Sequence, residues 1–126
     1  MSRQPFGTVT IEIPDGWRDG SVLKFAAQGE EPAPSIVVNR ATYSGEPLGD
    51  LIQGHAENLA QRLPGFEIIE QTDRQLTHRF GHIPRLAQMV RLEVRDEVLF
   101  IVTGTARAER FEDVLHDFEA AARSIE

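Results

Sequence analysis

The sequence predicts an α+β domain in which helices cover a mostly antiparallel sheet. Short alternating or apolar runs, typical of strands, fill most of the chain, and only two segments show apolar residues at helical spacing. The elements follow the order βββ-α-ββββ-α, which leaves few helices to connect parallel strands. The 126 residues and 40% hydrophobic content fit one domain, residues 1–126, with one ordinary core.

Three strands are expected before the first helix. Thr8–Ile13 alternates polar and apolar residues, as a strand with one face on a core does. The Pro-Asp-Gly sequence at residues 14–16 then favours a turn, because proline fixes φ and glycine accepts positive φ. Val22–Ala27 and Ser35–Thr42 are the next two strands, separated by a loop that contains two prolines.

The first helix is expected from about Pro47 to Leu63. Proline suits the first turn of a helix, and apolar residues recur at helical spacing until a Pro-Gly pair ends the pattern. Two further strands are expected after it, at Phe66–Thr72 and Leu76–Phe80.

A hairpin and a terminal helix complete the predicted fold. Met89–Val94 and Val98–Val102 flank a short polar turn, and the second run is apolar on both faces, which predicts a central strand. From about Glu109, an amphipathic helix places Phe111 and Phe118 on one apolar stripe.

Composition excludes several classes of function. The net charge of −7 repels a polyanion, so nucleic acid is not expected as the main partner. The absence of cysteine excludes thiol nucleophiles, cysteine-bound zinc and dithiol redox chemistry. The start of the chain lacks the pattern of a signal peptide and the longest apolar run is strand-sized, so we expect a cytoplasmic protein that is not integral to a membrane.

No catalytic or metal-binding pattern is present. The four histidines do not form an HExxH motif, the serines lack a nucleophile frame, and no glycine-rich phosphate-binding motif occurs. We therefore expect no enzyme, no catalytic residue, no metal and no cofactor, with His78 and His82 exposed beside a turn. An alternative stays open, in which the basic segment at residues 78–91 serves a small-ligand-binding domain or an enzyme.

Four runs of the sequence, taken in their order and spacing, carry a resemblance to a known family. The runs are Phe6–Asp19, Val37–Arg40, Leu63–Phe66 and, after Gln88, Val98–Thr103. Together they resemble the DcrB-like family, and especially its cytoplasmic branch, the Eag chaperones of type VI secretion effectors. The resemblance spans nearly the whole chain.

The resemblance implies both a fold and a function. The fold would be a PsbP-like α/β/α sandwich, with a sheet of about six strands flanked by two helices. The protein would be a homodimeric cytoplasmic chaperone or adaptor. Its partner would be the N-terminal transmembrane helices of a secreted effector, which it keeps soluble until loading.

The resemblance also implies a protein-binding groove. Apolar side chains would cover the partner helix and one amide would meet its small polar residues. The alternative that these are ordinary core residues stays open, because a one-residue slip sends every strand side chain to the opposite face. The implied groove residues are Leu23, Phe25, Ile36, Val38, Leu59, Leu63 and Gln88.

Overall fold

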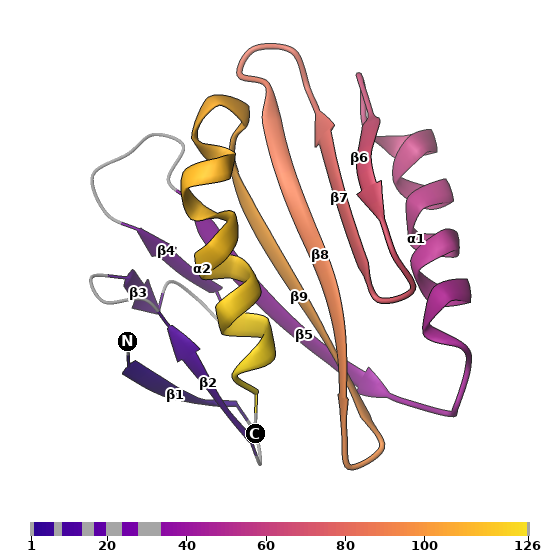
Figure 1. The fold of residues 1–126 in the computed structure, drawn as a ribbon, viewed down its shortest axis with the longest axis vertical. Helices are drawn as coiled ribbons and strands as arrows, with labels where there is room; N and C mark the ends of the chain where they lie inside the picture. Colours follow the sequence, from indigo (N-terminus) through magenta and orange to yellow (C-terminus); the bar gives the residue numbers. More distant parts are fainter. Residues whose placement is uncertain (1, 7–8, 14–16, 20–23, 28–33, 126) are drawn as a thin grey trace.

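The main element of the fold is a seven-stranded, entirely antiparallel sheet. The computed structural model describes residues 2–6, 9–13, 17–19, 24–27 and 34–125. Figure 1 shows the sheet, whose strand order is β3-β4-β5-β9-β8-β7-β6. Its strands are β3 (Trp17–Asp19), β4 (Lys24–Ala27), β5 (Ser35–Thr42), β6 (Glu67–Gln71), β7 (Gln75–Phe80), β8 (Leu86–Arg95) and β9 (Val98–Arg107).

A small second sheet and two helices complete the architecture. β1 (Ser2–Phe6) pairs with β2 (Val9–Ile13) as a separate hairpin, and β2 lies against α2 (Phe111–Arg123). A short 3-10 turn at Ala108–Arg110 leads into α2, and α1 is Leu48–Arg62. α2 crosses the front of the sheet, whereas α1 stands beside β6 and β7 (Figure 1).

The two helices enclose two apolar cores on opposite faces of the sheet. α2 packs on β5, β8 and β9, and Phe118, which is fully buried, lies directly over Gly104. A Cβ atom at residue 104 would overlap the Phe118 ring, so this close approach requires glycine. α1 packs through Ile52, Ala56 and Leu59 on β7, β8 and the first part of β9. The predicted α/β/α sandwich is therefore confirmed.

Most predicted elements are present. α1 begins directly after Pro47, and Val98–Val102 belongs to β9, the middle strand of the sheet, as predicted. The hairpin between β8 and β9 turns at Asp96 and Glu97, which both have positive φ, as a two-residue type I′ turn requires.

The strand count was predicted less well. The main sheet has seven strands rather than about six, and two strands that the sequence did not indicate, β1 and β3, precede the first helix. β1 contains Pro5, which has no backbone N–H to donate, and β3 has three residues, too few for a periodic pattern. α2 begins at Phe111 instead of Glu109, because residues 108–110 form the 3-10 turn.

Candidate functional site

Part of the α1 face of the sheet carries no helix within the described residues. Val37 on β5 points away from α2, since its neighbours Ile36 and Val38 are buried beneath α2, and it belongs to neither apolar core. It is half-buried, and Asn39 is exposed. We call this surface the open strip and define it by Val37, Asn39, Gln88, Ile101, Thr103 and Thr105.

Strand pairing places the residues of the open strip in adjacent cross-strand rows. Between β5 and β9, Val37 lies opposite Thr103 and Asn39 lies opposite Ile101. Thr105 lies opposite Gln88 on β8. Ile101 contacts the edge of the core under α1, so the strip continues directly from that core. The surface combines two half-buried aliphatic side chains with hydroxyl and amide groups.

One cross-strand row is polar across four strands and includes Gln88 and Thr105 of the open strip. Ser35, Thr105, Gln88 and His78 are consecutive cross-strand partners on β5, β9, β8 and β7. His78 Nε2 is 3.0 Å from Gln88 Oε1, and Gln88 Nε2 donates to Thr105 Oγ1 at 2.9 Å. This polar row connects the buried region near α1 with the open strip.

His78 is the buried end of the polar row. Its side chain is 0% exposed and its ring lies 4.9 Å from the Phe66 ring and 5.6 Å from the Phe80 ring. Burial lowers the pKa of His78 to about 4, and His55 on α1 adds a repulsive contribution. The imidazole is therefore neutral at pH 7. The sequence-based expectation of an exposed His78 was wrong, whereas His82 is exposed.

The residues implied by the resemblance are divided between the two faces. Ile36 and Val38, 0% and 1% exposed, lie in the core under α2. Leu59 is buried under α1, Leu63 is half-buried at its end, and Gln88 alone lies in the open strip. Leu23 lies outside the described residues, and for Phe25 only the backbone pairing with Ile36 is described.

The structure adds residues that the sequence did not single out. Val37 alternates with Ile36 and Val38, so it faces the opposite side of the sheet. Thr103, Thr105 and Ile101 follow the same alternation on β9. The sequence could not show which face of the sheet each of these residues occupies. β5 and β9 carry apolar residues at successive positions, and such runs do not reveal which side chains face a helix.

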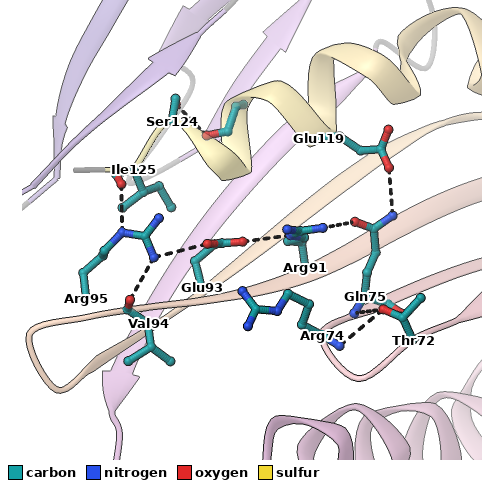
Figure 2. A network of polar contacts seen from close by, with 11 residues as sticks. Thr72, Arg74, Gln75, Arg91, Glu93, Val94, Arg95, Glu119, Ser124 and Ile125 are labelled. Atoms are coloured by element: carbon teal, nitrogen blue, oxygen red, sulfur yellow. Dashed lines mark hydrogen bonds and ion pairs between the residues drawn. The ribbon is translucent and has the colours of Figure 1, made fainter.

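The basic segment uses its charges within the fold. Glu93 is 4% exposed and pairs with Arg91 and Arg95 at N–O distances of 2.8 and 3.2 Å. Figure 2 shows its carboxylate between the two guanidinium groups. Arg79 and Arg85 both pair with Glu67 on β6, at 3.2 and 3.5 Å. No group of three or more metal-ligating side chains occurs in the described ranges. These four arginines therefore pair with carboxylates of the protein itself. They do not form a separate cationic cluster that would favour the alternative of a small-ligand-binding domain or an enzyme.

The same network fixes α2 to the sheet. Arg95 Nε donates to the carbonyl of Ile125 at 3.0 Å, and Gln75 Nε2 donates to Glu119 Oε2 at 3.1 Å. Arg91 joins the two parts by donating to Gln75 Oε1 at 3.0 Å (Figure 2). The arginines of β8 therefore have a structural role.

Comparison with known proteins gives one family match and several structural matches. The DcrB family profile matches residues 9–124. A Pseudomonas aeruginosa protein named Effector EagT6 is 35% identical over 66 residues, which make up 50% of this chain and 46% of that protein. The match thus spans about half the length of this relative.

Solved structures share the fold over nearly their whole length. PA94 of Pseudomonas aeruginosa, of unknown function, has a TM-score of 0.66 at 21% identity and covers 98% of this chain and 94% of its own. The Ran-binding protein Mog1p of Saccharomyces cerevisiae has a TM-score of 0.65 at 13% identity, with 100% and 95% covered. PsbP of Synechocystis (CyanoP) has a TM-score of 0.64 at 13% identity, with 99% and 91% covered. At these identities the likeness concerns the fold alone.

Proposed function

Since this chain belongs to the DcrB family, we propose that it is a cytoplasmic chaperone or adaptor for a type VI secretion effector. In this proposal it acts as a homodimer, binds the effector's N-terminal transmembrane helices and keeps them soluble until loading. The similarity to the protein named Effector EagT6 supports the link to effectors. Within the described residues, none of the helices has the length and apolar character needed to cross a membrane.

The observation that carries the proposal is the open strip. An isolated transmembrane helix exposes apolar surface on all sides, at a cost of about 25 cal/mol per Å² in water. Val37 and Ile101 offer apolar surface to such a helix, and Gln88 adds an amide for its polar positions. A helix keeps its own backbone hydrogen bonds, so a sheet face can cover it without supplying backbone partners.

The dimensions of the open strip suit one helix. From the row of Ile101 to the row of Thr105 the strip spans five residues along β9, or four steps of about 3.4 Å, which is about 14 Å. About nine helical residues cover that length. From β5 to β8 the strip is two strand spacings wide, about 10 Å, which matches the diameter of a helix with its side chains.

The proposal is tested with a synthetic helix. The probe is a lysine-flanked leucine–alanine peptide of about 20 residues, long enough to span a bilayer, with one central serine. We expect the protein to keep the peptide in solution through high-speed centrifugation and to bind it in a fluorescence titration. Val37→Glu should weaken binding at least about tenfold, because a charged group in the strip must lose its water against an apolar helix.

Ile69→Glu is the matched control. Ile69 is 45% exposed on β6, at the edge of the sheet away from β5, and the substitution changes net charge by the same amount. The control should bind as the wild-type protein does. The proposal fails if the wild-type protein leaves the peptide insoluble, or if both variants bind equally.

A further inference from the structure

We propose that His78 is a positioning residue that sets the direction of the hydrogen bonds in the polar row, so that the open strip presents donors to its partner. The inference rests on the proposed function for the identity of the partner. The inference is based on the geometry of the polar row, formed by Ser35, Thr105, Gln88 and His78. The proposed function does not itself require a role for His78.

The first step concerns the hydrogen on His78. Gln88 Oε1 can only accept, and it lies 3.0 Å from His78 Nε2, so the neutral ring carries its hydrogen on Nε2. His78 Nδ1 is buried and has no hydrogen-bond partner among the described residues, as suits a nitrogen that carries no hydrogen. A second proton would place a charge on a ring that is 0% exposed and lies beside the rings of Phe66 and Phe80, and burial disfavours that charge.

The second step concerns the amide of Gln88. Because its oxygen faces His78, its nitrogen faces Thr105 and donates to Oγ1 at 2.9 Å. The amide nitrogen carries two hydrogens, and only one is used in this bond. Without a donor at His78 the amide could turn over and present its oxygen to the open strip.

The third step concerns Thr105. Its hydroxyl oxygen accepts from Gln88, so its own hydrogen is left to donate. Thr105 lies opposite Ser35 on β5, at the end of the row away from α1. The strip therefore offers an amide N–H and a hydroxyl O–H. The matching chemistry on an apolar helix is an acceptor oxygen, from a serine or threonine side chain or from a backbone carbonyl.

A binding cycle tests this role with two variants and two peptides. The peptides are the lysine-flanked leucine–alanine helix with a central serine and the same helix with alanine instead. We expect the wild-type protein to prefer the serine peptide by about tenfold, the upper part of the range for one net hydrogen bond. His78→Leu, which has no donor, should lose the preference, whereas His78→Gln, which keeps an N–H for Gln88, should retain it.

The ratio of the affinities for the serine and alanine peptides distinguishes a positioning role of His78 from a role in packing alone. A substitution that only loosens the fold weakens binding of both peptides by the same factor and leaves their ratio unchanged. An unchanged serine preference in His78→Leu would therefore overturn the inference, even if the variant is less stable.

A second measurement needs no ligand. A long-range ¹H–¹⁵N correlation spectrum of the wild-type protein at pH 7 should show His78 with hydrogen on Nε2 and none on Nδ1. The opposite tautomer overturns the inference and leaves the proposed function standing. If the tautomer is as expected but neither peptide binds, the proposed function fails, and the role of His78 in partner binding fails with it.

Discussion

The pKa of His78 shows how burial changes the protonation of a single side chain. It lies beside the rings of Phe66 and Phe80, and its Nε2 is 3.0 Å from Gln88 Oε1. Burial, the larger cause, and the nearby His55 both lower the pKa of His78, to about 4. Unfolding exposes the ring to water and restores a pKa near 6.5. The residue therefore links folding to pH.

The sign of this linkage predicts a loss of stability in acid. Below pH 6.5 the unfolded chain takes up a proton that the folded chain refuses until pH falls to about 4, so stability falls across that window. His78→Gln should reduce the fall by about 2 to 3 kcal/mol, because each pKa unit corresponds to 1.36 kcal/mol. Urea titrations at a series of pH values measure the difference.

His55 also contributes to the acid sensitivity that this measurement records. The pKa of His55 is also lowered, by burial and then by Arg62, so part of the acid sensitivity should persist in His78→Gln. His116→Gln, at an exposed position on α2, is the matched control for the loss of a histidine. A His78→Gln profile that superimposes on that of the wild type would contradict the prediction.

At the scale of elements, α2 depends on polar contacts as well as on its apolar stripe. Glu93 on β8 is buried between Arg91 and Arg95, and Arg95 also holds the carbonyl of Ile125, just beyond α2 (Figure 2). A buried carboxylate tolerates the loss of water only with such partners. The same contacts orient both guanidinium groups toward the end of α2.

Replacing Glu93 should therefore loosen the end of α2. Glu93→Gln removes the charge that holds both arginines, and we expect a stability loss of about 1 to 3 kcal/mol, less than for a fully enclosed pair because the arginines are partly solvated. Hydrogen exchange should accelerate first near Ile125. Glu109→Gln, which removes an exposed pair with Arg107, should change stability by less than about 1 kcal/mol. Equal losses in the two variants would argue against this role of Glu93.

The sequence predicted those elements whose local signals are strong. α1 has a proline before its first residue and a regular apolar stripe, and the β8–β9 hairpin has two runs around a polar turn. β1 and β3 gave no such signal. Their strand structure comes from pairing with β2 and β4, while Pro5 in β1 and the three-residue length of β3 leave no periodic pattern to detect.

The candidate site was less predictable than the fold, because it depends on which face each strand residue occupies. Gln88 was assigned to the groove, and it lies in the open strip, where its role stays a prediction. Ile36 and Val38 were assigned to the groove, whereas the structure buries them under α2. The cross-strand contact of Gln88 with His78 depends on the register between β7 and β8, which no local pattern specifies.

At the scale of the whole molecule, the two faces of the sheet have different functions in this proposal. The α2 face is closed by an apolar core that includes Val38, which is 1% exposed. Within the described residues, α1 covers the other face over β7 and β8, and no helix covers it over part of β5 and β9. Adjacent residues of β5 therefore belong to different layers of the sandwich, and only one of them is available to a partner.

The adjacent pair Val37 and Val38 tests this division within one strand. Val38→Glu places a carboxylate beneath α2 without a partner, and we expect a loss of at least about 4 kcal/mol, enough to unfold a domain of ordinary stability. Val37→Glu places the same group at the half-buried surface, where it keeps much of its water, and should cost less than about 1 kcal/mol. Both variants have the same composition and charge, so circular dichroism and urea titration compare position alone. If Val37→Glu unfolds as readily as Val38→Glu, the strip is closed in the folded protein and cannot receive a helix. If it stays folded and loses the leucine–alanine peptide, the defect lies in binding.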